Sequence, residues 1–533
     1  MKKNFLAVLG FITIVLTGNS QNKIDVLHYK YNIELNDNND TIYGKAEIKL
    51  KFPVPGSIAE FDLANLNQNK MGMMVTNASF VTHNLPSPVF SHMKEKLIVT
   101  TTLSYKKNDT ASISIEYKGI PSDGLIISKN KYGHRTFFAD NWPNRAHNWI
   151  PCVDDPGDKA SVEFIITAPQ HYQIIANGIQ IEETNLPGNK KLTHWKEDVP
   201  LPTKVMVIGA ADFAVSHAGD VNCVPVSSWV YPENKKEGFY DYAQARDILA
   251  FFNDYIGPYP YKKLANVQSK TIFGGMENAG AIFYFENSVT GSRQEEALVA
   301  HEIVHQWFGN MATEKSFAHL WLSEGFATYL THIFIESKYG ADSLNNEMIN
   351  DRQMIIDFAK TWNKPVVDAV SPFRQLLNPG SYQKGSWILH MLRRQLGDSV
   401  FHKVIRNYYD QYKGKNAATE DFKAVTEKTS GKKLEIFFRQ WLYTPGLPQL
   451  KMSWKYSEKQ KTVAITVEQL QKDMFQFPLD IGVSVPASKF RVEKLTVTKK
   501  TETFTIPVKN KPTLLVADPQ TSLLFEGSLT ELK

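Results

Sequence analysis

The spacing of apolar residues changes twice along this chain, so one uniform architecture cannot account for it. Up to about residue 213, short runs such as Tyr29 to Leu35 alternate apolar and polar side chains, as half-buried strands do. From about residue 237 the apolar side chains recur with helical spacing. The breaker Thr444-Pro445-Gly446-Leu447-Pro448 ends that region, and alternation returns after it. These changes indicate three successive domains.

We therefore predict a multi-domain α+β protein. Residues 21–215 should form an all-β domain, residues 216–446 a mostly helical domain, and residues 447–533 a small β-sandwich. The clearest strand patterns are Tyr29 to Leu35, Thr41 to Phe52, Ala111 to Tyr117, Ser161 to Thr167, Lys204 to Ile208, Thr462 to Glu468, Leu479 to Val485, Arg491 to Val497 and Phe504 to Val508. The helical patterns are Tyr240 to Tyr255, Gln294 to Phe308, Glu324 to Lys338, Asn345 to Phe358, Tyr382 to Leu396, Ser399 to Tyr412, Thr419 to Thr429 and Leu434 to Tyr443.

The first 20 residues have the form of a secretory signal peptide. Lys2 and Lys3 precede a short apolar run, and Gly18-Asn19-Ser20 places small residues at a cleavage spacing. The apolar run is too short to span a bilayer comfortably. We expect an exported protein, periplasmic or secreted, without stable membrane insertion after signal cleavage; an uncleaved signal that anchors the chain is the alternative. Recovery of the whole pool from the cytosol of fractionated cells would contradict export.

Charge and cysteine content narrow the possible partners. The chain has 60 basic and 55 acidic residues, a net charge of +5, and no basic tract, which excludes nucleic acid as an expected partner. The two cysteines, Cys152 and Cys223, could form one disulfide after export, although two free buried thiols are favoured. The composition does not define an oligomeric state.

The strongest chemical signal is His301-Glu302-Ile303-Val304-His305, followed by Glu324. Two histidines four residues apart on a helix lie about 40° apart around its axis, so both imidazoles can reach one metal ion. A His, His, Glu ligand set with one open position is the catalytic form of a zinc site. Glu302 would lie beside the ion, where its carboxylate can take a proton from an activated water molecule. The pattern predicts a zinc hydrolase that binds one ion.

The surrounding residues predict that this motif lies on a well-formed, buried helix. Ser292-Arg293-Gln294-Glu295 has the pattern of a capping box, with Ser292 as N-cap, and Gly309-Asn310 provides a stop. The alternative is a core helix whose histidines only form hydrogen bonds. An unliganded pair of buried histidines would carry a desolvation cost that a metal ion removes.

A second motif, Gly274-Gly275-Met276-Glu277-Asn278, lies in an apolar, strand-like stretch before the predicted metal-binding helix. Adjacent glycines allow another backbone to approach closely, as when a substrate lies along a strand edge. Glu277 is an acidic residue in a segment that otherwise looks buried, so it needs a cationic partner, and the α-amine of a peptide would serve. A turn with a capping carboxylate is the alternative reading.

Tyr382 begins Tyr382-Gln383-Lys384-Gly385 at a predicted helix start. Its phenol is a neutral donor that could form a hydrogen bond to the oxyanion of a tetrahedral intermediate. Position alone does not distinguish Tyr382 from the other tyrosines, of which the chain has 22 in all.

Together the motifs G-x-M-E-N, H-E-x-x-H, W-L-x-E-G and Y-x-K-G, in this order, resemble the gluzincin zinc aminopeptidases typified by aminopeptidase N. The likeness extends over nearly the whole mature chain. It implies a saddle-shaped N-terminal β-domain followed by a thermolysin-like catalytic domain. It also implies zinc on His301, His305 and Glu324, with Glu302 as general base, Tyr382 at the oxyanion, Glu277 holding the amine, and Gly274, Gly275, Met276 and Asn278 along the substrate.

The chain departs from the family pattern in three respects. Many members have Trp or Pro where this chain has Ala279, so the pocket for the first side chain is expected to differ. Members often place Gln where this chain reads Asp140-Asn141-Trp142, which makes Asp140 the candidate for a second amine contact. The large members continue into a helical C-terminal domain, so we expect a three-domain form that lacks it. The family also includes a leukotriene hydrolase branch, whose C-terminal helices help recognise an acidic substrate. Because this chain has a β-rich region after the predicted catalytic domain, the epoxide-hydrolase activity of that branch loses support.

The sequence thus predicts a zinc-dependent aminopeptidase that acts on peptides with a free N-terminus. A thermolysin-type zinc endopeptidase is the closest alternative, because it shares the metal chemistry but does not select an amine. An exported binding protein without catalytic activity is a third possibility. The preferred first residue and the physiological peptide are not indicated.

Overall fold

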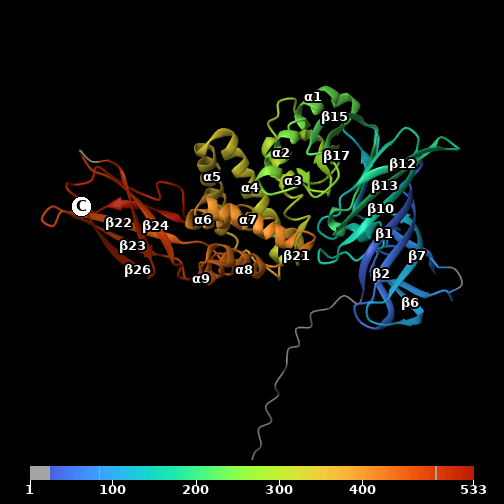
Figure 1. The fold of residues 1–533 in the computed structure, drawn as a ribbon, viewed down its shortest axis with the longest axis horizontal. Helices are drawn as coiled ribbons and strands as arrows, with labels where there is room; N and C mark the ends of the chain where they lie inside the picture. Colours follow the sequence, from blue (N-terminus) through green and yellow to red (C-terminus); the bar gives the residue numbers. More distant parts are fainter. Residues whose placement is uncertain (1–23, 83–84, 487–488, 533) are drawn as a thin grey trace, which may run out of the picture.

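The three predicted regions follow one another along an elongated molecule (Figure 1). The computed structural model describes residues 24–82, 85–486 and 489–532. The predicted signal peptide, residues 1–20, lies outside the described residues. Within the described part of the chain, no helix combines the length and apolar character needed to cross a membrane.

The N-terminal domain is built from three sheets, as its alternating sequence predicts. The largest is seven-stranded, in the order β12 (Ile179–Leu186), β13 (Lys190–Leu201), β10 (Ala160–Pro169), β1 (Asp25–Glu34), β2 (Ile42–Lys51), β7 (Thr110–Ile120) and β4 (Gly72–Phe80). A three-stranded sheet contains β3 (Gly56–Asp62), β6 (Lys96–Tyr105) and β5 (Val89–Met93), and a four-stranded sheet contains β11 (Gln173–Ala176), β14 (Ile208–Ala211), β9 (Arg135–Ala139) and β8 (Leu125–Lys129). Strict alternation of burial along β10 places Val162, Phe164 and Ile166 in the core.

The central domain begins with a five-stranded mixed sheet that the sequence analysis did not predict. Its order is β15 (Ala214–Val221), β16 (Val224–Val230), β17 (Leu264–Ser269), β19 (Ala281–Phe285) and β18 (Gly275–Met276). Every residue of β17 is buried, so the strand has no alternating pattern to reveal it. The short strand β18 is an edge strand, and it begins at Gly275, the second glycine of the predicted pair.

Nine α-helices follow or flank this sheet among the described residues. They are α1 (Lys235–Tyr242), α2 (Ala245–Tyr255), α3 (Glu296–Val304), α4 (Trp321–Tyr339), α5 (Ala341–Ala359), α6 (Gly385–Leu396), α7 (Asp398–Tyr412), α8 (Thr419–Ser430) and α9 (Glu435–Phe438). Two π-helical turns, η7 (Gly380–Lys384) and η8 (Arg439–Tyr443), precede α6 and follow α9, and a small parallel pair joins β20 (Ala312–Glu314) to β21 (Lys415–Ala417). Helix α4 lies at the centre of the domain, since all its residues from Trp321 to Phe334 are buried.

The C-terminal region has two sheets, which is compatible with the predicted small β-sandwich. One sheet has the order β26 (Thr501–Pro507), β23 (Thr462–Gln469), β22 (Gln449–Ser457) and β28 (Glu526–Glu531), and the other has the order β25 (Arg491–Val497), β24 (Phe477–Ser484) and β27 (Leu514–Ala517). Arg352 of α5 joins this region to the central domain, because it donates to Asp518 at 2.6 Å and to the Leu523 carbonyl at 2.8 Å.

Two lysine side chains also join the N-terminal domain to the central one. Lys204 forms an ion pair with Glu314 of β20, and both side chains are almost fully buried. Lys159 donates to the carbonyl of Met311 at 2.9 Å and to that of Lys415 at 3.1 Å. The predicted strand from Lys204 to Ile208 is wrong: residues Thr203–Val205 form a 3-10 turn that carries Lys204 into this junction.

The two cysteines form no disulfide. Cys152 is buried, as expected, whereas Cys223 is exposed, so the prediction of two buried thiols holds only for Cys152.

Candidate active site

Helix α3 places His301 and His305 on one face, close to its C-terminal end. The regular helix begins at Glu296 and ends at Val304, and His305 continues its path as the C-cap. The predicted capping box is wrong, because Glu295 and not Ser292 is the N-cap residue, and its side chain makes no capping hydrogen bond. Instead, the carboxylate of Asp241 in α1 accepts hydrogen bonds from the backbone N–H groups of Thr290, Gly291 and Arg293 at 2.6 to 2.9 Å. A side chain distant in sequence therefore shapes the entry to α3.

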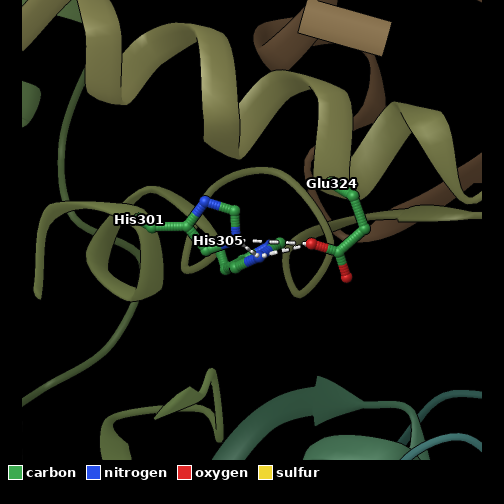
Figure 2. A group of neighbouring side chains, drawn as sticks. All are labelled: His301, His305 and Glu324. Carbon is green, nitrogen blue, oxygen red and sulfur yellow. Dashed lines mark hydrogen bonds and ion pairs between the residues drawn. The ribbon is translucent and has the colours of Figure 1, made fainter. Parts of the chain in front are cut away.

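The third predicted ligand, Glu324, lies on α4 and points toward the two imidazoles (Figure 2). The glycine that follows it explains how α4 reaches this position. A Cβ atom at Gly325 would lie 2.8 Å from the Cα of Gly385, so both positions need glycine where α4 meets the start of α6. This close contact brings Tyr382, just before α6, next to Glu324.

The three ligand atoms form a nearly equilateral triangle. The Nε2 atoms of His301 and His305 are 3.1 Å apart, and Glu324 Oε2 lies 3.3 and 3.2 Å from them. In a tetrahedral zinc site with bonds of about 2.0–2.1 Å, adjacent ligand atoms are roughly 3.3 Å apart. Glu324 Oε2 is buried and makes no hydrogen bond to the described residues. The donor set and its spacing therefore fit a zinc ion.

The surroundings of His305 also fit a metal ligand. Its Nδ1 lies 3.1 Å from the carbonyl oxygen of Phe308 and 3.2 Å from Ser323 Oγ. A carbonyl only accepts, so this contact assigns the proton to Nδ1 and leaves the Nε2 lone pair directed at the shared centre. Gly309 makes room for this arrangement, since a Cβ there would lie 2.3 Å from Ser323 Oγ.

Glu302 lies against the edge strand β18. A Cβ atom at Gly275 would be only 2.3 Å from Glu302 Oε1, so the carboxylate occupies the space that a side chain would fill. The missing side chain of Gly275 therefore makes room for Glu302, and the predicted place of Gly275 along the substrate stays a prediction. Burial raises the pKa of Glu302 well above its usual range, and the carboxylates of Glu277 and Glu324 add to this effect. Such an environment is typical of a catalytic acid or base.

We expect Gly275→Ala to lower kcat by about 100-fold, because the new methyl group must displace the Glu302 carboxylate and misplacement by about 1 Å costs roughly that much. Gly274→Ala is the matched comparison, since its Cβ would meet only Leu298 Cδ1 at 3.8 Å and should cost far less. Turnover and zinc content of both variants check this. Equal rates for the two variants would contradict the role given to Gly275.

Glu277 follows β18 and lies 5% exposed in the cavity, with no hydrogen bond or ion pair from its carboxylate to the described residues. Its backbone is held by two side chains that the sequence analysis did not identify. Gln306 donates to the Glu277 carbonyl at 2.9 Å and accepts from the Gly280 N–H at 2.9 Å, and Asn310 donates to the same carbonyl at 2.6 Å. For Gln306 the available signal was its position directly after His305, whereas the sequence indicated Asn310 only as part of the helix stop.

Tyr382 lies on the π-helical turn η7, and its ring stacks on that of His301, with centroids 5.9 Å apart. Burial and the neighbouring carboxylates of Glu324, Glu277 and Glu302 raise the pKa of Tyr382 well above its usual range. The phenol therefore stays protonated and can donate a hydrogen bond beside the three ligand atoms.

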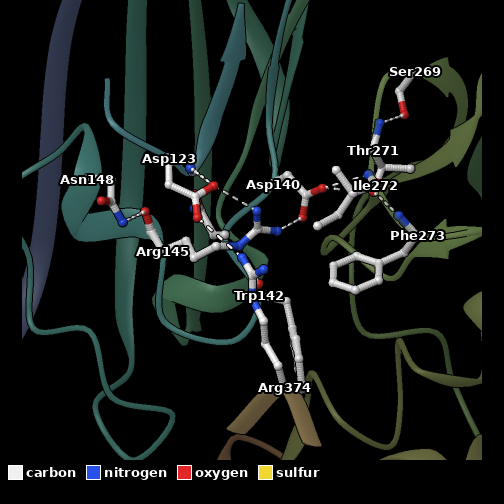
Figure 3. Close-up of polar contacts among 12 residues, drawn as sticks. Asp123, Asp140, Trp142, Arg145, Asn148, Ser269, Thr271, Ile272, Phe273 and Arg374 are labelled. Carbon is white, nitrogen blue, oxygen red and sulfur yellow. Dashed lines mark hydrogen bonds and ion pairs between the residues drawn. The ribbon is translucent and has the colours of Figure 1, made fainter. Parts of the chain in front are cut away.

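Asp140 does not reach the cavity, and this corrects the prediction that it contacts the substrate amine. Its carboxylate is 0% exposed and forms an ion pair with Arg145 (Figure 3). It also accepts hydrogen bonds from Thr271 Oγ1 and the Ile272 N–H, both at 3.0 Å. Asp140 thus anchors the N-terminal domain to the segment before β18. The side chain of Asn278 is likewise fully buried and does not line the cavity.

The remaining predicted residues line one cavity of about 610 Å³. Among its lining residues are Gly274, Gly275, Met276, Glu277, His301, Glu302, His305, Glu324 and Tyr382. Further lining residues, absent from the sequence prediction, are Trp142, Phe273, Leu298, Thr328, Thr331, His332 and Met354. The site is therefore a mostly apolar cleft with its ionisable groups gathered around the three ligand atoms.

A buried His–His–Glu cluster on two helices, beside a sheet edge and a second carboxylate, defines the site of a metallopeptidase. Comparison with protein families agrees with this class. Residues 26–205 match the Peptidase M1 N-terminal domain and residues 240–441 match the Peptidase family M1 domain. The chain belongs to the M1 peptidases, in agreement with the resemblance to the gluzincin, aminopeptidase N-like family.

Individual relatives are similar over part of their length. A probable aminopeptidase 2 of Sulfurisphaera tokodaii is 30% identical over 362 residues, which are 64% of this chain and 46% of that protein. Aminopeptidase M1-C of Oryza sativa is 28% identical over 327 residues, 58% of this chain and 37% of that protein. The glutamyl aminopeptidase of Homo sapiens is 26% identical over 402 residues, 67% of this chain and 42% of that protein. The matched region thus spans less than half the length of these relatives.

Proposed function

We propose that this protein is a zinc-dependent aminopeptidase that releases the first residue of peptides with a free N-terminus. The observation that supports this most directly is the buried carboxylate of Glu277, which has no hydrogen bond or ion pair to the described residues and lines the same cavity as the His301, His305 and Glu324 cluster. A buried carboxylate without a cationic partner is costly, and an α-ammonium group would remove that cost.

The three ligand atoms would hold one zinc ion. When bound, zinc supplies a Lewis acid that lowers the pKa of water towards about 7, polarises the scissile carbonyl and favours the ionised form of Glu302.

The other groups take roles that their positions allow. Glu277 forms an ion pair with the α-ammonium group and so fixes which peptide bond lies over the cluster. Glu302 accepts a proton from the attacking water molecule and later delivers it to the departing amine. Tyr382 donates a hydrogen bond to the oxyanion that forms on the carbonyl carbon. The bond between the first two residues breaks, which yields a free amino acid and a shortened peptide.

A panel of amino-acid amides, each also in N-acetylated form and with and without a chelator, tests the proposal. We expect hydrolysis of the free amides only, with loss of activity after chelation. Equal cleavage of a short peptide in its free and its N-acetylated form, measured beside the amides, would instead favour a thermolysin-type endopeptidase. Absence of both stoichiometric zinc and any hydrolysis would favour a binding protein without catalytic activity.

We expect Glu277→Gln to lower kcat/KM for free amides by about 100-fold, because loss of one partner from a buried charge pair typically costs 2–5 kcal/mol. The matched comparison is Glu237→Gln on α1, outside the cavity. The ratio of kcat/KM for the free amide to kcat/KM for the acetylated amide should fall in the Glu277 variant alone. An unchanged ratio would remove Glu277 from amine recognition.

We expect Tyr382→Phe to lower kcat by about 10²–10³-fold with little change in KM, since the phenol acts on the oxyanion and not on the bound substrate. Tyr43→Phe, at an exposed position in β2, is the control. Steady-state kinetics on the best amide check this. A Tyr382 variant with the parent kcat would contradict the oxyanion role.

A further inference from the structure

The cavity extends beyond the predicted cluster to a polar pair that the proposed mechanism does not use. One face of α4 carries a row of polar residues, separated by four, three and one positions along the helix. They are Glu324, Thr328, Thr331 and His332. Thr328, Thr331 and His332 all line the cavity. His332 is 7% exposed, and its Nε2 lies 2.9 Å from Oδ2 of the buried Asp351 in α5.

The contacts at the two ends of α3 show where the His332–Asp351 pair lies relative to Glu277. Gln306 and Asn310, just past the C-terminal end of α3, hold the backbone of Glu277. At the other end of α3, Glu296 accepts a hydrogen bond from Tyr339 Oη at 2.6 Å and pairs with Lys338, so the last turn of α4 lies there. Helices α3 and α4 are therefore antiparallel. Residues 331 and 332 lie displaced from Glu324 toward Ala297 and Leu298, away from Glu277.

The edge strand β18 runs parallel to α3. Gly275 contacts Glu302, whereas the preceding residue, Gly274, faces Leu298. A peptide whose amine is held by Glu277 and whose carbonyl lies at the ligand cluster must continue past Gly274 and Leu298. The side chain of its second residue then enters the part of the cavity lined by Thr331, His332 and Met354. This step rests on the proposed aminopeptidase function.

The hydrogen-bonding pattern of His332 defines what it can recognise. A carboxylate only accepts, so the contact with Asp351 assigns a proton to Nε2 of His332. The ring of His332 forms no second hydrogen bond, through Nδ1, within the part of the chain that the structure describes. Thr331 Oγ1 is buried and also unpartnered there. An apolar side chain packed here would leave these atoms unsatisfied. A hydroxyl or amide side chain both donates and accepts, so it could satisfy them.

We propose that His332, held in place by Asp351, is a specificity-determining residue for the position after the cleaved bond. It selects a neutral side chain with a hydroxyl or amide group over an apolar side chain of the same shape. Sites built to form hydrogen bonds reject isosteric analogues that lack them, because the buried polar groups are then left unpaired.

The test compares two peptides that differ only at the second residue, Thr or Val, after the first residue that is cleaved fastest as an amide. The wild-type protein should favour the Thr peptide in kcat/KM by about 5–10-fold, the amount that one hydrogen bond provides. In His332→Leu/Asp351→Leu, which removes both members of the pair, this ratio should fall to about one or below. The matched control is His217→Leu/Asp220→Leu, an exposed His–Asp pair 3.1 Å apart on β15, which should keep the wild-type ratio.

Hydrolysis of the amide, which has no side chain after the cleaved bond, reports on the proposed function separately. Failure of the wild-type protein on every amide would overturn that function and this inference together. Amide hydrolysis with equal rates for the two peptides, or a Thr preference that persists in the double variant, would overturn this inference alone. If the double variant does not fold, the same Thr-to-Val ratio of kcat/KM is measured in His332→Leu/Asp351→Asn, and the same two outcomes apply.

Discussion

Glu302→Gln should retain one zinc ion per chain and lose at least about 1000-fold in kcat, because general acid–base groups contribute about 10²–10⁴-fold. The glutamine keeps the shape that fits against Gly275 but cannot accept the proton of the attacking water molecule. The neighbouring ligands remain, so metal content should not change. Steady-state kinetics on the best amino-acid amide, together with metal analysis, check both halves of the expectation.

Glu295→Gln is the control, since it makes the same chemical change directly before the first residue of α3 and outside the cavity. It should keep the parent rate. A Glu302 variant that hydrolyses the amide within about tenfold of the parent would show that another group is the base. A variant that loses zinc along with activity would leave Glu302 with a structural role.

Sequence periodicity predicted the elements that have one buried and one exposed face. Helices α7 and α8 agree with their predicted ranges to within one residue at each end. The pattern from Lys204 to Ile208 failed because distant side chains decide its backbone. Asn177 donates to the Val205 carbonyl at 2.9 Å and accepts from the Val207 N–H at 2.6 Å. Local spacing contains no information about such partners.

The two buried strands of the five-stranded sheet, β17 and β19, were missed for a related reason. Strand β17 is covered on both faces, so its residues show neither alternation nor helical spacing. The strand next to it, β19 (Ala281–Phe285), is also almost entirely buried. Length and flanking turns were the only signals for these strands, and neither separates a buried strand from a short buried helix.

At the site, the prediction succeeded where chemistry depends on spacing along a helix. The separation of His301 and His305 fixes their common face, and the predicted third ligand, Glu324, lies within about 3.3 Å of both. Roles that depend on tertiary contacts were not predictable. The sequence does not reveal that Asp140 forms an ion pair with Arg145, or that Gly275 lies against Glu302.

Glu324→Gln should weaken zinc binding by more than about 100-fold and reduce activity after chelation to background. Loss of groups that only support a ligand already costs 10–100-fold in affinity, so loss of a ligand's charge should cost more. The amide fills the same volume on α4, which keeps the contact between Gly325 and Gly385. The variant should therefore fold, and the loss should reflect metal binding alone.

Thermal unfolding at a series of free zinc concentrations measures this directly. In the parent, zinc at 100 times its dissociation constant should stabilise the folded state by about 2.7 kcal/mol, because it binds only the assembled cluster. The Glu324 variant should gain less than about 0.4 kcal/mol at the same zinc concentration, and its midpoint should hardly rise. Glu336→Gln, three turns further along α4 and paired with Arg393 at 2.6 Å, should respond as the parent does. Parental zinc affinity in the Glu324 variant would show that His301, His305 and Glu324 do not share one ion, and the proposed hydrolytic function would fail with them.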